Sequence, residues 1–359
     1  ASGRLDAARE PARAAQAADP PNVGALEVLL EVAARQQDRP ALRTGLARLE
    51  EFIAGQPTSD YLQVLRAQTH MALGEPGPAR QALAEFCATE AGRTSLPALL
   101  TLQDLHRLAD DFTAAEQTLD AAAALEPGHP GVLHGRVQLL AAQGRFDDLV
   151  TLAQDARVDK QNADVLVSAA TALAASPVHR AQAVALCQRA RELAPQNVSA
   201  LLALGDLEYQ RGDATAAQQA YRAVLALQPN QPVALNNLAW VLAEAGAELE
   251  QALSAARQAV AAQPADANYR DTLAFVLKRL GRLEDARAEY RRSADLTAPA
   301  SAPRARVLVR LAQVCAELAD WPAVEQCLNE ALAVHGTQPV FAAEEQAEID
   351  RLRAAAHQR

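Results

Sequence analysis

The stretch that decides the fold occurs twice. Residues 234–264 read ALNNLAWVLAEAGAELEQALSAARQAVAAQP, and residues 269–296 read YRDTLAFVLKRLGRLEDARAEYRRSADL. Each stretch begins with a bulky apolar run, passes a glycine and places an alanine in a second segment that mixes polar and apolar residues. The two glycines, Gly246 and Gly281, lie 35 positions apart. The chain therefore repeats one segment at a spacing of about 35 residues, which is typical of repeat proteins.

Three markers recur with this period along the chain. The glycines after the first segment are Gly144, Gly212, Gly246 and Gly281, with gaps of 68, 34 and 35. The alanines of the second segment are Ala115, Ala183, Ala217, Ala252 and Ala286, with gaps of 68, 34, 35 and 34, and Leu149 takes the skipped place. The prolines that close the unit are Pro127, Pro195, Pro229 and Pro264, with gaps of 68, 34 and 35. Because independent markers share one period, the chain is predicted to be an array of repeats.

The unit at 198–231 predicts a pair of helices. Apolar residues at helical spacing line one face of the first helix: Leu201, Leu204 and Leu207. Gly212 follows the last turn, where glycine tolerates a left-handed backbone, and Asp213 can accept from the free N–H groups of the next helix. The second helix buries Ala217, Ala220, Tyr221, Val224 and Leu225, and Pro229 ends the unit. One hairpin cannot bury its own apolar faces, so copies are expected to stack.

Composition favours an all-α chain. Half of the 359 residues are apolar but only 4% are aromatic, because Ala and Leu dominate and both favour helix. The formal net charge is −10, which disfavours nucleic-acid binding, since that needs clustered Lys and Arg. No run of about 18 apolar residues predicts a membrane span. No charged and apolar leader is visible at the start of the sequence.

The repeated residues resemble the tetratricopeptide repeat (TPR) family. The matching positions in three consecutive units are Leu204, Gly205, Gly212, Ala217, Tyr221 and Pro229, then Leu238, Ala239, Gly246, Ala252 and Pro264, then Leu273, Ala274, Gly281, Ala286 and Tyr290. The resemblance implies an all-α, right-handed superhelical solenoid of stacked helix hairpins whose first helices line the concave surface. It is clearest over 164–296 and extends to 96–163.

The register assigns boundaries along the whole chain. A half repeat at 1–22, with Gly3, Ala8 and Pro20 in the turn, packing and closing places, precedes repeats near 23–56, 60–95, 96–129, 130–163, 164–197, 198–231, 232–266 and 267–296. A linker is expected at 297–303, the one candidate break, and the last repeat follows at 304–338 with Ala319 in place of the turn glycine. The segment 339–359 is predicted to be one amphipathic capping helix with Phe341, Ile349 and Leu352 on its apolar side.

The motifs of common enzyme and cofactor sites are absent from the sequence: it has no HExxH, GxSxG, Walker or GxGxxG pattern. His70 and His106 lie on predicted first helices and are interpreted as partly exposed helix residues, since neither has metal-ligand spacing. The four cysteines match no CxxC pattern and are expected to be free thiols, with Cys315 and Cys327 as neighbours. The chain is therefore predicted to bind no cofactor or metal and to be no enzyme.

The predicted partner-binding surface is the concave face of the first helices between 206 and 279. Carried over from the TPR pattern, its residues are Asp206, Tyr209, Asn236, Asn237, Trp240, Asp271, Phe275, Lys278 and Arg279. Amide side chains can bond a peptide backbone, and aromatic residues are common interface anchors. The alternative is that Trp240 and Phe275 only pack between neighbouring helices.

The main hypothesis is a non-catalytic scaffold that binds a peptide or protein segment in its concave groove. The run LNNLAWVLAEAG, then YRDTLAFVLKRLGRLEDA and an acidic tail, is similar to the C-terminal arrays of bacterial TPR proteins linked to the cell envelope and to exopolysaccharide or exosortase systems. That similarity implies an assembly or export role. The alternative is the regulatory or substrate-recruiting part of an enzyme whose catalytic domain precedes residue 1, and a third hypothesis is self-association through the solenoid ends. The compartment stays open between the bacterial periplasm or cell envelope and the cytoplasm.

Overall fold

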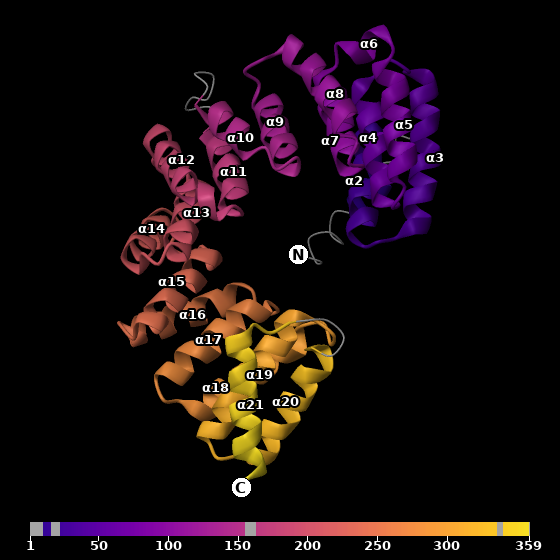
Figure 1. The fold of residues 1–359 in the computed structure, drawn as a ribbon. Coiled ribbons are helices and arrows are strands. Elements are labelled where there is room, and N and C mark those ends of the chain that lie inside the picture. Colours follow the sequence, from indigo (N-terminus) through magenta and orange to yellow (C-terminus); the bar gives the residue numbers. More distant parts are fainter. Residues whose placement is uncertain (1–9, 16–21, 155–162, 336–339, 359) are drawn as a thin grey trace. The chain divides into compact units, whose positions relative to one another are not determined.

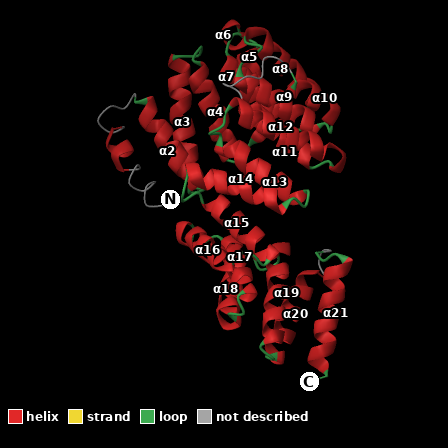
Figure 2. Ribbon diagram, turned by 90° about the vertical axis from the view of Figure 1, so that its left-hand side faces the viewer, coloured by secondary structure: helices red, strands yellow, loops and turns green. Residues whose placement is uncertain are grey.

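The computed structural model describes residues 10–15, 22–154, 163–335 and 340–358. Across these ranges the chain folds into helices joined by turns, without a strand (Figure 2). The predicted all-α class is confirmed. Of the predicted half repeat at 1–22, residues 10–15 are helical, whereas Gly3, Ala8 and Pro20 lie outside the described residues.

The chain divides into two compact units, and each is described by itself. The first comprises residues 1–182 and the second residues 183–359. The division falls inside α12 (Arg180–Leu193), within the repeat predicted at 164–197. The candidate break predicted at 297–303 lies within the second unit.

The first unit consists of hairpins whose helices pack against their neighbours in sequence (Figure 1). Its helices are α2 (Val23–Arg35), α3 (Arg39–Gly55), α4 (Asp60–Ala72), α5 (Pro76–Cys87), α6 (Glu90–Arg93), α7 (Leu96–Leu108), α8 (Phe112–Leu125), α9 (Pro130–Ala142), α10 (Phe146–Ala153), α11 (Ala163–Ala174) and the 3-10 helix η2 (Pro177–His179). Three apolar clusters follow one another, around Leu42, Leu83 and Leu119. Each cluster joins neighbouring hairpins, as expected where a repeat contacts only the next one.

The second unit contains the repeats with the clearest sequence pattern. After α12 its helices are α13 (Val198–Gln210), α14 (Ala214–Leu227), α15 (Pro232–Ala245), α16 (Leu249–Ala262), α17 (Ala267–Arg279), α18 (Leu283–Leu296), α19 (Ala302–Glu317), α20 (Trp321–His335) and α21 (Ala343–His357). Helices α13 and α14, α15 and α16, α17 and α18, and α19 and α20 form hairpins. The first helices α13, α15, α17 and α19 together form what we term the first-helix surface.

The α13–α14 hairpin shows why these residues form this motif. The Asn197 side chain accepts from the Ala200 N–H at 3.0 Å and begins α13. The Asp213 side chain accepts from the Ala216 N–H at 2.9 Å and begins α14, which confirms the predicted cap. Ala217 is fully buried where the two helices meet. The small side chain at this place lets the helices approach closely.

The turn between first and second helices needs a left-handed residue. Gly74, Gly144, Gly212, Gly246 and Gly281 all have positive φ there. In three other repeats a residue with a side chain holds this conformation: Gln37, Asp110 and Ala319. A left-handed backbone costs an ordinary L-residue roughly 1–2 kcal/mol, and somewhat less for Asp. The repeats without a glycine at this place thus keep the turn, although its backbone is locally strained.

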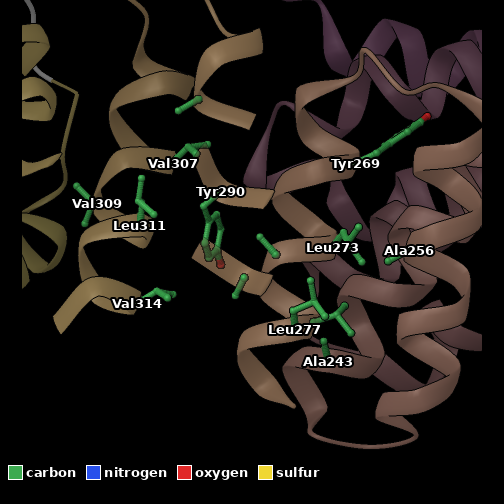
Figure 3. Close-up of a cluster of buried hydrophobic side chains, with 14 of the residues drawn as sticks. Ala243, Ala256, Tyr269, Leu273, Leu277, Tyr290, Val307, Val309, Leu311 and Val314 are labelled. Atoms are coloured by element: carbon green, nitrogen blue, oxygen red, sulfur yellow. The ribbon is translucent and has the colours of Figure 1, made fainter. Parts of the chain in front are cut away.

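A single apolar cluster extends through most of the second unit, from Ala217 to Ala356. Figure 3 shows Tyr290 between Leu273 and Leu277 of α17 and the apolar side chains of α19. The cluster thus includes residues before and after the predicted linker at 297–303, so the core has no interruption there. Helix α19 also begins within that range, at Ala302.

The last helix differs in extent from the prediction. Helix α21 spans Ala343–His357, so the predicted capping helix at 339–359 begins later than expected. Its first turn is stabilised by Glu345, whose carboxylate accepts from the Ala342 N–H at 2.9 Å. Ile349 is fully buried, whereas Phe341 precedes the helix and is half-buried.

Candidate functional site

Five of the nine predicted partner-binding residues lie around one pocket in the second unit. The pocket has a volume of about 350 Å³ and is lined by Asp206, Tyr209, Gln210, Tyr221, Asn236, Asn237, Trp240, Val241 and Thr272. These residues come from α13, α14, α15 and the start of α17. We term it the α13–α15 pocket. Its volume is at the lower end of the roughly 300–1,000 Å³ typical of small-ligand sites.

A hydrogen-bond network holds the polar wall of this pocket. The Tyr221 hydroxyl donates to Asp206 Oδ1 at 2.6 Å, and Asn237 Nδ2 donates to the same oxygen at 2.9 Å. Asn236 Nδ2 donates to Asn237 Oδ1 at 3.1 Å. Burial, followed by the bond to Asp206, raises the pKa of Tyr221, so its hydroxyl stays protonated and remains a donor. Asp206 of α13 is therefore held by hydrogen bonds from α14 and α15, and Asn237 is held by its bonds to Asp206 and Asn236.

Gly205 makes this network possible. A Cβ atom at this position would lie 2.5 Å from Cε1 of Tyr221, closer than carbon atoms pack. Without it the Tyr221 ring, which is 1% exposed, lies directly against α13. The Leu-Gly pair of this repeat thus brings the Tyr221 hydroxyl to the next residue, Asp206.

The aromatic wall has a second chain of hydrogen bonds. Trp240 Nε1 donates to the Tyr209 hydroxyl at 2.8 Å, and that hydroxyl donates to Glu244 Oε2 at 2.9 Å. Burial raises the pKa of Tyr209, which keeps the hydroxyl protonated. Tyr209 thereby links α13 to two residues of α15.

Trp240 also begins a stack that extends along the first-helix surface. The ring centroids of Trp240 and Phe275 lie 4.6 Å apart with 29° between their planes, and the Arg310 guanidinium carbon lies 5.3 Å from the Trp240 centroid. Arg310 also forms an ion pair with Asp271. Burial raises the pKa of Asp271, although Arg310 acts in the opposite direction. Trp240 and Phe275 do pack on each other, as the alternative interpretation expects, yet both remain half-buried.

The last two predicted residues lie elsewhere. Lys278 Nζ forms an ion pair with Glu317 at 3.1 Å and a hydrogen bond to Gln313 at 3.4 Å. Arg279 is exposed, and its guanidinium points to the turn at Gly246. Neither residue lines the α13–α15 pocket.

Five contributors were not predicted from the sequence: Gln210, Tyr221, Val241 and Thr272 in the pocket lining, and Arg310 beside Trp240. Tyr221 was assigned only to the buried face of its helix, although a buried hydroxyl needs a partner and that requirement was a usable signal. Gln210 was not considered, and nothing in its sequence context distinguishes it. Arg310 lies on α19 in the last predicted repeat, and its approach to the Trp240 ring of α15 is not contained in the repeat pattern.

The two histidines singled out from the sequence are paired with acids. His70 and His106 are half-buried and face acids at the following turn, Glu75 at 3.0 Å and Asp111 at 3.8 Å. No group of three His, Cys, Asp or Glu side chains that could hold a metal ion is found within the described ranges. Likewise, none of the described helices has the length and apolar character that crossing a membrane requires.

Comparison with known proteins agrees with the repeat geometry. Models of the tetratricopeptide repeat match residues 179–232, 202–267 and 263–335. Residues 179–335, somewhat less than half of the chain, are thus similar to tetratricopeptide repeats. It is also 30% identical over 132 residues to a TPR repeat-containing thioredoxin, TTL4, of Arabidopsis thaliana. That match covers 36% of this chain and spans only 19% of the relative's length.

A solved structure shows the same architecture over most of the chain. The crystal structure of the APC/C hetero-tetramer Cut9–Hcn1 superposes with a TM-score of 0.50 at 15% sequence identity. The match covers 90% of this chain and 55% of that one. At this identity the similarity establishes the repeat fold alone.

Proposed function

We propose that this chain is a non-catalytic scaffold that binds an extended segment of a partner protein along the first-helix surface of its second unit, in a bacterial assembly or export system. Tetratricopeptide repeats indicate protein partners in general. The bacterial context rests on the resemblance of the last repeats to envelope-linked arrays.

The α13–α15 pocket is the observation that supports binding at this surface. Its lining combines fixed amides and a carboxylate with the half-buried Tyr209 and Trp240. Interfaces draw most of their affinity from a few such anchors, and Trp and Tyr are the commonest. The continuing stack of Trp240 and Phe275 offers a second contact for a segment that crosses α15 and α17.

Site-specific photo-crosslinking tests this proposal with a matched pair of positions. Gln210 and Gln219 are both exposed glutamines, but Gln210 lines the pocket and Gln219 lies on α14 outside it. A benzoylphenylalanine probe at Gln210 should label a partner segment that a probe at Gln219 does not. A synthetic peptide of that segment should then bind the purified chain, as measured by calorimetry.

The same peptide can be used to measure how much the stack of Trp240 and Phe275 contributes to the binding affinity. Trp240→Ala should weaken binding by roughly 2 kcal/mol, or about 30-fold, if Trp240 is an anchor. Because Trp240 also packs on Phe275, the affinity is measured well below the melting temperature and per folded molecule. A folded Trp240→Ala, Phe275→Ala double variant that binds at full strength would falsify the proposal for this surface.

A second candidate function is the substrate-recruiting part of a larger enzyme. It is supported by the Arabidopsis relative, whose name joins TPR repeats to a thioredoxin, and of which this chain spans only 19%. The sequence of the full open reading frame decides between the two. A catalytic domain in the same frame supports this candidate, whereas further repeats alone exclude it.

A further inference from the structure

The α13–α15 pocket contains hydrogen-bond acceptors that the chain itself does not use. Asn236 Oδ1 is buried and has no donor within the described part of the chain. Both hydrogen bonds to Asp206 end on Oδ1, so Oδ2 receives none from the described residues. Tyr221 and Asn237 both donate to Asp206 Oδ1 and not to these atoms. The pocket thus keeps two acceptor atoms without a donor among the described residues.

The charge of the pocket is also uncompensated. Nearby acids are paired with arginine or lysine: Glu208 with Arg211 at 2.6 Å, Glu289 with Arg270 at 2.9 Å, Glu317 with Lys278 at 3.1 Å, and Asp271 with Arg310. Asp206 forms no ion pair among the described residues, and it is the single charged residue in the lining. Glu244, which accepts from Tyr209 beside the pocket, adds a second negative charge.

We infer that the α13–α15 pocket binds the guanidinium group of an arginine side chain carried by the partner segment. This inference rests on the proposed function and specifies its chemistry. The planar guanidinium has five N–H donors in a fixed fork, so it can donate to Asp206 Oδ2 and, after a rotation of the Asn236 side chain that uncovers the buried Oδ1, to that atom as well. Tyr209 and Trp240 contact the apolar stem, since both rings line the same pocket. A lysine ammonium, being a compact point charge, fits this arrangement less well.

The NMR signal of the Trp240 indole N–H gives a direct measurement of ligand binding in the α13–α15 pocket. The chain has two tryptophans, so Trp321→Phe leaves Trp240 as the one indole signal in a ¹H–¹⁵N spectrum. Titration with N-acetyl-L-arginine amide should shift this signal saturably. N-acetyl-L-citrulline amide, which has nearly the same shape but no charge, should not shift it. N-acetyl-L-lysine amide should bind more weakly than the arginine compound.

Two variants of one hairpin separate the pocket from the fold. Asp206→Asn keeps an acceptor for Tyr221 but removes the charge, and it should weaken arginine binding about tenfold or more. Asp213→Asn makes the same chemical change at a helix cap outside the pocket, where Asn is an equally good cap, and should leave binding unchanged. The inference is overturned if the arginine and citrulline compounds behave alike, or if Asp206→Asn binds arginine as the parent does.

A peptide identifies the source of the guanidinium. The blocked peptide acetyl-Gly-Leu-Arg-Leu-Gly-amide should bind more tightly than N-acetyl-L-arginine amide, because a segment adds contacts along α15. Equal or weaker peptide binding would assign the pocket to a free small molecule and contradict the inference. The two proposals also fail separately. A crosslinked partner segment without arginine refutes the arginine subsite and leaves the scaffold standing. Arginine binding without any partner labelled from Gln210 refutes the scaffold, and with it the partner as the source of the arginine, while the recognition of a guanidinium by the pocket stands.

Discussion

Replacement of Gly205 with alanine tests the packing that builds the candidate site. The new Cβ would lie 2.5 Å from Cε1 and 2.9 Å from Cζ of Tyr221, so the ring must move. Overpacking a buried site costs about 1–3 kcal/mol. Alanine in a helix is favoured over glycine by about 0.5–1 kcal/mol, which offsets part of this cost. The expected net loss of stability is about 1 kcal/mol, within a range of about 0–2.5 kcal/mol.

The second unit itself indicates where the ring would go. Ala274 and Tyr290 occupy the same two places one pair of repeats later, each 69 residues on (274 − 205 = 69 and 290 − 221 = 69). There a tyrosine lies beside an alanine, fully buried, and forms no hydrogen bond within the described chain. We expect Tyr221 to take a similar position in the variant and to lose its bond to Asp206. Arginine binding at the pocket should then weaken as well.

Thermal unfolding followed by circular dichroism measures the effect. For a unit of this size the midpoint should fall by about 2–4 °C for each kcal/mol lost. Gly55→Ala is the control, because Gly55 lies in α3 and a Cβ there would meet nothing within 4 Å. The control should keep or slightly raise the midpoint. If Gly205→Ala behaved like the control, the close approach of Tyr221 to α13 would be wrong.

Three further predictions concern single residues. Ala217→Leu should lower the melting midpoint by the equivalent of about 1–3 kcal/mol, because Ala217 is fully buried between helices; an unchanged melt would contradict the assigned packing. Arg310→Met should cost about 1–3 kcal/mol at pH 7, less than a fully buried pair because the Arg310 side chain is 35% exposed. The pKa of Asp271 is already raised by burial and rises further without Arg310, so the variant loses stability as pH rises through that pKa. Denaturant titrations should show the difference from the parent shrinking in acid, and a pH-independent difference would exclude this cause. Burial raises the pKa of Cys87 to about 11, so iodoacetamide at pH 8 should alkylate it about 100-fold more slowly than an ordinary thiol. Peptide mass spectrometry over a pH series checks this, and a rate like that of free cysteine would refute it.

Local rules account for what could be predicted from the sequence. Asp213 is recognisable as a cap, Gly212 as a turn residue and Ala217 as a packing contact, because each role depends on a few neighbouring residues and on the repeat period. Five of the seven pocket-lining residues on α13 and α15 were also placed on one surface from the sequence, since first-helix positions of successive repeats face the same way.

The remaining contacts of the candidate site depend on distances between helices, and the repeat period of the sequence gives no information about those distances. Lys278 and Arg279 are adjacent in sequence, but one pairs with Glu317 while the other is exposed near the Gly246 turn. The bond from Tyr221 to Asp206 depends on how closely two helices approach at Gly205. Arg310 reaches Trp240 across two repeats and an irregular loop, which no local pattern encodes.

The left-handed turns also bear on where such an array first comes apart. An array whose repeats contact only their neighbours frays at its weakest hairpins before it melts as a whole. Gln37, Glu248 and Ala319 hold a left-handed backbone with a side chain present, and Asp110 does so at less cost. Amide hydrogen exchange should therefore be fastest, among comparably buried helices, in the hairpins of α2 and α3, of α15 and α16, and of α19 and α20. The residue at each turn would then determine the order in which the hairpins open by local unfolding.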